Sequence, residues 1–191
     1  MNKALSDTVY EISRNNELCL VLGGDHSIAS GSLHGQLMNY GDDLKVVWID
    51  AHADLNNFEG SPSGNYHGMS AGHVLGTIKQ GEVYGFDWLT KNLKPSNIAY
   101  IGLRDLDPFE SQFIREKNIM HFTPYDIDNM GGIGSVMRQI ENHFSIDTVK
   151  NPVFISFDID GMCSSFIEGT GTRVRYGLSA REIIFILQFL R

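Results

Sequence analysis

The sequence of 191 residues lacks the features that mark several large classes of protein. It has two cysteines, Cys19 in an apolar run and Cys163 in a polar loop, and their spacing predicts neither a disulfide framework nor a zinc knuckle. No apolar run approaches the roughly 20 residues that a helix needs to span a bilayer. The first residues, Met1–Ala4, lead into an amphipathic segment without the apolar core of a signal peptide. We therefore expect a soluble, cytoplasmic protein with no membrane partner.

Basic residues are also scarce. The chain has 15 lysines and arginines against 23 acidic residues, a formal net charge of −8, and no basic run stands out. This balance argues against nucleic acid or an anionic membrane as the main partner. Apolar residues make up 42% of the chain, which is enough for one domain with a sizeable core.

Short apolar runs alternate with segments of helical periodicity along the chain. The predicted strands are 18–22, 45–50, 97–102, 119–122 and 153–160. The predicted helices are 4–16, 27–40, 69–80, 108–118, 131–144 and the segment from Ser179 to the end. This alternation predicts an α/β fold whose parallel sheet is covered by helices on both faces. The carboxyl ends of the strands then share one edge of the sheet, where such folds bind their ligands.

Metal-binding side chains follow the strand predicted at 45–50. Asp50, His52 and Asp54 occupy every second position, so an extended chain directs all three side chains to one side. Side chains of the same kind follow two other predicted strands: His26, Asp158 and Asp160. Because parallel strands end at one edge, we expect these six residues to converge.

Two imidazoles and four carboxylates form a ligand set that suits Mn²⁺, with Fe²⁺, Zn²⁺ and Mg²⁺ as alternatives. Four buried carboxylates need compensation, and two dications balance their charge. Six ligands are too few for two separate octahedral ions, so carboxylates and a water would have to bridge them. A water between two dications loses its proton near neutral pH, which points to hydrolysis.

Five motifs resemble those of a known family. Gly23–Ser27, Asp50–Asp54 and Ser156–Gly161 are similar to the three metal-binding motifs of the ureohydrolases, and Ser63–Gly68 and Gly102–Pro108 resemble the arginases among them. The resemblance covers nearly the whole chain in the same order. It implies an arginase/deacetylase-like, three-layer fold with a parallel sheet flanked by helices. It also implies two Mn²⁺ ions per subunit, hydrolysis of L-arginine to L-ornithine and urea, and a homotrimer for the full-length protein.

The resemblance assigns metal and proton-transfer roles to residues of this chain. One ion takes His26, Asp50, Asp54 and Asp158, and the other takes His52, Asp50, Asp158 and Asp160. Asp54 also accepts or relays a proton, and His67 corresponds to a histidine that protonates the leaving group. The other histidines, His34, His73, His121 and His143, lack such context, and we expect them to be helix or surface residues.

The resemblance also assigns substrate contacts. Asn56, Ser63 and Asn65 match positions that hold the substrate α-carboxylate. Asp107 and Glu110 match positions near its α-amino group, and Thr172 matches a threonine that lines the site.

The chain departs from the family pattern in two ways. The family has an acidic residue and a proline in the segment that corresponds to Met162–Ser165, and this chain has neither. We therefore expect some loss of order at the metal site, but not loss of the site. The resemblance also implies that residues 1–191 are a partial catalytic domain, without the family's first strands and its C-terminal part. The missing C-terminal part includes one strand of the family's sheet, which carries a glutamate that pairs with the substrate guanidinium. In that sheet this strand lies between the two strands that correspond to residues 18–22 and 153–158 of this chain.

Two alternatives remain open at this point. The chain could act on agmatine or another guanidino compound, although the Ser63–Gly68 motif and Asp107 favour a substrate with an α-amino acid head. It could instead be a non-catalytic chain that binds metal or associates with full-length subunits.

Overall fold

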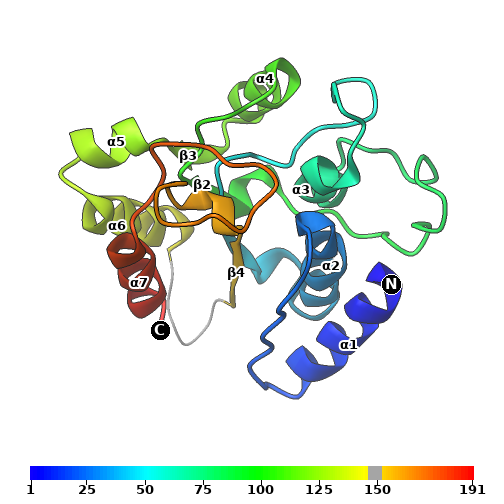
Figure 1. Ribbon diagram of the computed structural model, residues 1–191. Helices are drawn as coiled ribbons and strands as arrows, with labels where there is room; N and C mark the ends of the chain where they lie inside the picture. Colours follow the sequence, from blue (N-terminus) through cyan, green and yellow to red (C-terminus); the bar gives the residue numbers. More distant parts are fainter. Residues whose placement is uncertain (146–151) are drawn as a thin grey trace. The chain divides into compact units, whose positions relative to one another are not determined.

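The computed structural model describes residues 1–145 and 152–191 and forms two compact units. Figure 1 shows their helices and strands in chain order. Unit 1 consists of Met1–Leu44, Ala53–Asn97 and Asp107–Asn118. Unit 2 consists of Lys45–His52, Ile98–Leu106 and Ile119–Arg191.

Unit 2 contains a parallel sheet of four strands in the order β3-β2-β1-β4. The strands are β1 Lys45–Ile49, β2 Ile98–Ile101, β3 Met120–Phe122 and β4 Val153–Phe157. Ile49 is in register with Ile101 on one side and Phe157 on the other. The carboxyl ends of β1, β2 and β4 therefore lie level with each other, and the residues that follow them are neighbours.

Three helices of unit 2 complete this part of the fold: α5 Pro124–Asn129, α6 Ile133–Phe144 and α7 Ala180–Phe189. The apolar stripe of α6 and buried residues of α7 pack on one face of the sheet, where Val47, Ile49, Ala99 and Ile101 form the centre of the core. Figure 1 shows α6 and α7 side by side, in agreement with their direct contact. The predicted parallel sheet flanked by helices is thereby confirmed.

Unit 1 is helical in the part of the chain that is described. Its helices are α1 Asn2–Arg14, α2 Ala29–Tyr40, α3 Ser70–Leu75 and α4 Pro108–Lys117. Two glycines let α1 and α2 pack closely, since a Cβ on Gly31 would lie 2.6 Å from the Asn2 carbonyl oxygen and one on Gly35 would lie 2.5 Å from that of Ser6. Within the described residues, no helix has the length and apolar character needed to cross a membrane.

Short 3-10 segments connect these elements. They are η1 His26–Ile28, η2 Gly41–Asp43, η3 Tyr66–Met69 and η4 Pro95–Asn97 in unit 1, and η5 Ile159–Gly161 in unit 2. Two of them, η1 and η3, contact each other. They carry two of the predicted site residues, His26 and His67.

The strand predicted at 18–22 is wrong. This segment has no strand conformation, and Leu18, Leu20 and Leu22 are 97%, 76% and 86% exposed. A strand inside a sheet needs a neighbour for its backbone N–H and C=O groups, and no β-pairing within the described residues involves this segment. Its apolar composition alone was therefore not sufficient to form a strand.

Two helix predictions also need correction. The helix predicted at 69–80 ends at Leu75, because Gly76 adopts a left-handed conformation with φ +82° and terminates it. Helix α5 was not predicted, although Thr123 and Asp126 form a capping box around its first turn and Pro124 starts it.

Candidate metal centre

Asp50 lies immediately after β1 and is 1% exposed. Its Oδ2 accepts a hydrogen bond of 2.9 Å from the indole Nε1 of Trp48, and its Oδ1 accepts one of 2.8 Å from the backbone N–H of His52. Trp48 and Asp50 are two residues apart, so the strand period brings both side chains to the same side. These donors fix the direction of the Asp50 carboxylate.

Two glycines allow neighbouring backbone segments to approach Asp50. A Cβ on Gly161 would lie 3.0 Å from the Asp50 backbone nitrogen, and one on Gly102 would lie 3.1 Å from the Asp50 carbonyl oxygen. Gly102 also has φ +98°, which side-chain-bearing residues rarely adopt. Small residues at these positions therefore keep the ends of β1, β2 and β4 close together.

Asp158 and Asp160 follow β4. The Asp158 backbone N–H donates to the Ile49 carbonyl at 2.9 Å, which continues the strand pairing by one residue. Its carboxylate caps η5 by accepting a 2.9 Å hydrogen bond from the backbone N–H of Asp160. Asp160 is 2% exposed, and its Oδ2 accepts a 2.7 Å hydrogen bond from Thr172 Oγ1.

Asp50, His52 and Asp160 form a compact group in unit 2, each offering a ligand atom within 4.8 Å of the others. His52 Nδ1 lies 3.2 Å from Asp160 Oδ2 and 3.5 Å from Asp50 Oδ1. Asp50 and Asp158 also offer oxygen atoms within 4.8 Å of each other. Unit 2 thus brings together four of the six predicted metal ligands around Asp50.

The electrostatics of this group fit a bound cation. Burial by itself lowers the pKa of His52, but the Asp160 and Asp50 carboxylates outweigh burial and raise it to about 11. For Asp160, burial acts to raise the pKa, and the hydrogen bonds from His52 and Thr172 outweigh it, so the pKa falls. The proton on the His52 imidazole therefore balances part of the carboxylate charge, and a bound dication would take its place. A set of nitrogen and oxygen donors of this kind suits Mn²⁺.

The other two predicted ligands form a pair in unit 1. His26 Nδ1 lies 3.0 Å from Asp54 Oδ2, and Ser70 Oγ donates to the same oxygen at 3.4 Å. Asp54 is 4% exposed and has φ +51°, so it does not continue the extended conformation of β1, which ends at Ile49. The period-two argument consequently holds only as far as Asp50. Aspartate is one of the residue types that adopt the left-handed region more readily than most.

His67 is half-buried on η3 in unit 1. Hydrogen bonds from Ser27 lower the pKa of Asp25, and the nearby His67 and His26 lower it further. The proton-transfer role of His67 remains a prediction.

The predicted substrate residues of unit 1 divide into two groups. Asn56 is buried and donates from Nδ2 to Asp107 Oδ2 at 2.8 Å. Glu110 is 3% exposed and accepts from the backbone N–H groups of Leu55 and Asp107, both at 2.9 Å. Glu110 therefore supports the segments that carry Asn56 and Asp107.

Ser63 and Asn65 form the second group and lie on an exposed loop. Ser63 Oγ accepts a hydrogen bond of 3.2 Å from the backbone N–H of Asn65. In unit 2, the exposed Thr172 contacts Asp160 as described. The assignment of all these residues to the substrate stays a prediction.

The sequence reasoning missed several residues that support the site. The period of β1 could have paired Trp48 with Asp50, but nothing local in the sequence linked Ser70 to Asp54. Arg104 and Asp105 are adjacent in the sequence, but Asp105 Oδ2 lies 3.6 Å from His52 Nε2. The guanidinium of Arg104 instead donates to backbone carbonyl groups, including that of Asp160 at 2.6 Å.

A family model described as the arginase family matches residues 1–191. The chain belongs to the arginase family. Arginase-1 of Sus scrofa is 41% identical over 189 residues, which cover 98% of this chain and 58% of that protein. The solved structure of Entamoeba histolytica arginase in complex with L-ornithine has a TM-score of 0.89 at 35% identity and covers 98% of this chain and 62% of its own. The solved structure of Bacillus cereus arginase has a TM-score of 0.89 at 39% identity, and the match covers 98% of this chain and 63% of that one.

These comparisons confirm the arginase resemblance and the fold inferred from the motifs. As a member of the arginase family, this chain spans about half the length of the curated relatives it matches, for example 58% of the pig protein and 52% of arginase from Plasmodium berghei.

Proposed function

We propose that this chain carries the metal-binding part of an enzyme that hydrolyses L-arginine to L-ornithine and urea with two Mn²⁺ ions. The observation that supports the proposal best is the group of Asp50, His52 and Asp160, with Asp158 beside Asp50. Membership of the arginase family supports the reaction, and the relative from Entamoeba histolytica was solved with L-ornithine.

We assign six residues as metal ligands: His26, Asp50, His52, Asp54, Asp158 and Asp160. Bound dications would supply Lewis-acid chemistry and a nucleophile for hydrolysis at neutral pH. The hydrogen bonds from Trp48 and Thr172 orient the ligand carboxylates before any ion binds.

Hydrolysis adds water across a C–N bond of the guanidinium group, so a proton has to reach the departing amine. We assign this proton to His67, and we assign to Asp54 the acceptance or relay of the proton lost by the attacking water. Asp54 is suited to this because it is buried and already paired with His26 at 3.0 Å. A histidine is suited to the first task because its ordinary pKa lies near neutrality.

The amino acid head of the substrate would contact unit 1. We assign its α-carboxylate to Asn56, Ser63 and Asn65, and its α-amino group to Asp107, which Glu110 holds through a backbone hydrogen bond. We also assign Thr172 as a residue that lines the substrate site. A homotrimeric assembly and a cytoplasmic location complete the proposal.

Urea release tests the proposal. The 191-residue chain is incubated with Mn²⁺ and either L-arginine or agmatine, and urea and bound manganese are measured together. Urea from L-arginine with two ions per chain supports the proposal, whereas urea from agmatine alone would contradict it.

The ligand assignment needs a variant and a control. His52→Ala should remove one of the two manganese ions first, because His52 is assigned to one ion only and lies between two of its acidic ligands. His121→Ala, an exposed histidine on β3, should leave the manganese content unchanged. An unchanged content in His52→Ala would mean that the ligand assignment is wrong.

A second function is favoured by one observation. The leucines of segment 18–22 are exposed where a buried strand was expected, so the chain presents an apolar segment to solvent. A chain of this kind could bind manganese without turnover and associate with longer subunits of the family. Two bound ions without urea from either substrate would favour this alternative.

A further inference from the structure

The Arg104 guanidinium donates to six backbone carbonyl groups in unit 2. The acceptors and their distances are Gly102 at 2.9 Å, Asp160 at 2.6 Å, Gly161 at 3.3 Å, Met162 at 3.1 Å, Val174 at 3.0 Å and Arg175 at 2.8 Å. A guanidinium has five N–H groups, so at least one of them is shared. Its hydrogen-bonding capacity is therefore used fully on the main chain.

Five of these six acceptors lie at or beside the two ends of one segment, the 161–177 loop. Asp160–Met162 is the start of the loop and Val174–Arg175 is close to its end, so a single side chain joins the two. Further backbone bonds close the same base, with Cys163 N–H donating to the Leu178 carbonyl at 2.9 Å and Leu178 N–H donating to that of Gly161 at 3.0 Å. The loop between these points carries Thr172, the residue that donates to Asp160 Oδ2.

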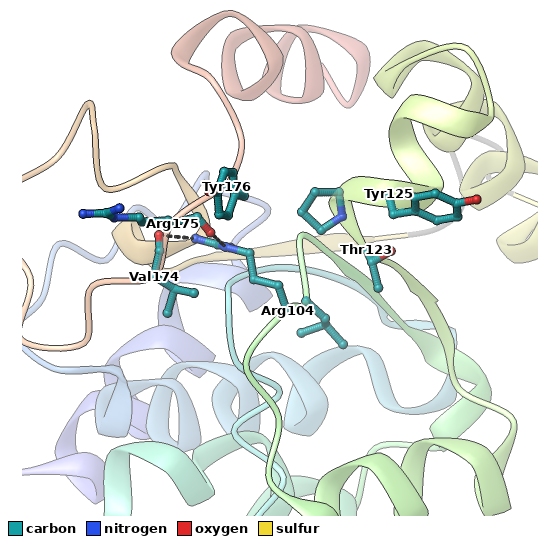
Figure 2. A pocket seen from close by; sticks show the side chains of 8 residues that line it. Arg104, Thr123, Tyr125, Val174, Arg175 and Tyr176 are labelled. Carbon is teal, nitrogen blue, oxygen red and sulfur yellow. Dashed lines mark hydrogen bonds between the residues drawn. The ribbon is translucent and has the colours of Figure 1, made fainter.

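The loop is built around the Arg104 side chain. A Cβ on Gly177 would lie 2.5 Å from Arg104 Nη2 and 2.6 Å from the Met162 carbonyl carbon, so only glycine fits there. Next to it, Tyr176 holds φ +61°, an unfavourable conformation that surrounding contacts must maintain. Figure 2 shows Arg104 extending toward the main chain at Val174 and Arg175, beside a cavity of about 480 Å³.

We propose that Arg104 is a positioning residue for Asp160. By fastening both ends of the 161–177 loop, it holds the Asp160 backbone and keeps Thr172 in hydrogen-bonding distance of the carboxylate that faces His52. The inference rests on the proposed function, since its consequence is a stronger metal site. Outer partners that orient a metal ligand typically change metal affinity by about 10- to 100-fold.

The planar fork of arginine is essential to this role. A lysine ammonium has three donors at a single nitrogen, so it cannot also replace the bonds that Nε and Nη1 of Arg104 make to Arg175, Gly102 and Gly161. Charge alone predicts the opposite effect, because a cation near Asp160 repels a dication and its removal would strengthen metal binding. Positioning and charge effects are therefore distinguishable by their sign.

Metal affinity is the first measurement. Mn²⁺ dissociation constants from titration calorimetry are compared for the wild-type chain, Arg104→Lys, Arg104→Gln and Arg138→Lys. Arg138 is an exposed arginine on α6 and serves as the matched control. Both Arg104 variants should bind Mn²⁺ about 10- to 100-fold more weakly than the wild type and the control. The visible absorption bands of bound Co²⁺ should also change in both variants, since these bands report ligand geometry.

Loop order is measured without metal. Trypsin can cleave after Arg173 and Arg175, so the rate of cleavage at these two sites, identified by mass spectrometry, reports how firmly the loop is held. Cleavage should be several-fold faster in Arg104→Lys and in Arg104→Gln than in the wild type and in Arg138→Lys. Circular dichroism verifies that each variant retains its folded structure.

Three outcomes would overturn the inference. Tighter Mn²⁺ binding by Arg104→Gln with unchanged binding by Arg104→Lys would mean that charge, and not position, is the effect. Faster cleavage with unaltered Mn²⁺ affinity would mean that Arg104 only supports the loop. A wild-type chain that binds Mn²⁺ as weakly as both variants would also contradict it. By contrast, a wild-type chain that binds no dication would first refute the proposed function, and the role for Asp160 with it.

Discussion

Two histidines outside the candidate metal centre, His34 and His73, are buried in unit 1 and are each 4% exposed. His34 Nδ1 is 2.9 Å from Ser6 Oγ, and His73 Nδ1 is 2.7 Å from Tyr66 Oη. The rings of Phe86 and Trp88 lie against them. Sequence reasoning placed these histidines on helices or the surface, and only the packing of α1, α2 and α3 shows that they are internal.

Burial favours the neutral form of both imidazoles. It lowers the pKa of His34 to about 4, with a smaller contribution from Lys3 and Lys91 and an opposing one from Asp7. It also lowers the pKa of His73 to about 4, against an opposing contribution from Glu82. In the described residues His34 Nε2 has no hydrogen-bond partner, so a proton there would be buried without an acceptor.

These two histidines should make folding sensitive to acid. Between pH 6.5, the ordinary pKa of histidine, and about 4, the unfolded chain binds more protons than the folded one, so stability falls as pH falls. As the pH falls through this interval, each histidine lowers the free energy of unfolding by on the order of 3 kcal/mol. Above pH 6.5 neither histidine makes stability depend on pH. Urea midpoints followed by tryptophan fluorescence from pH 4.5 to 7.5 measure the slope, which should flatten in His34→Gln and in His73→Gln.

The control for this prediction is His121→Gln, which changes an exposed histidine of unit 2. Its slope should equal that of the wild type, even if its midpoint differs slightly. Equal slopes in all three variants would show that His34 and His73 do not resist protonation in the folded chain.

At the scale of single elements, helix ends and apolar stripes explain most of the agreement with the sequence. Ser179 forms a capping box with Glu182 at the start of α7, as its position before an apolar run predicts. Helix α7 presents isoleucines to different surroundings, since Ile186 is 0% exposed in the unit 2 core and Ile184 is 55% exposed. The same substitution at these two positions therefore separates packing from helix propensity.

Ile186→Ala should destabilise the chain by about 2–5 kcal/mol, because it leaves a cavity between α7 and the sheet. Ile184→Ala has the same change in helix propensity and should alter stability by no more than about 0.5 kcal/mol. Urea unfolding of both variants at pH 7.5 provides the comparison. Equal losses would show that α7 is not packed on the core of unit 2.

At the scale of the whole molecule, exposed apolar surface is the main departure from an ordinary globular chain. Three leucines of segment 18–22 are largely exposed, and β4 pairs with a strand on one side only among the described residues. Its residues Val153, Phe154 and Ile155 are consequently only half-buried, despite an apolar sequence typical of a central strand. Surfaces of this kind promote association.

Replacing Leu18, Leu20 and Leu22 together by serine should reduce self-association of the chain while leaving its unfolding midpoint nearly unchanged. The leucines have little buried contact to lose, so the effect is on the surface and not on the core. Sedimentation velocity over a range of concentrations measures it. Tyr84→Ser, at another fully exposed residue of unit 1, is the control. Unchanged association in the triple variant would contradict the prediction.

The local sequence determined the elements whose stability is mostly local. The period of the helices, the capping residue Ser179 and the apolar run of β1 all predicted what is observed. The three metal-binding motifs, together with Ser63–Gly68 and Gly102–Pro108, also predicted the arginase family. These features depend on residues a few positions apart, so a single sequence contains them.

The tertiary structure decided everything that depends on partners distant in the chain. Segment 18–22 is apolar but has no neighbouring strand to pair with, and Asp54 leaves the extended conformation that its spacing implied. The fastening of the 161–177 loop by Arg104 joins residues more than 50 positions apart. Hydrogen-bond partners and burial are properties of the assembled chain, and no local pattern specifies them.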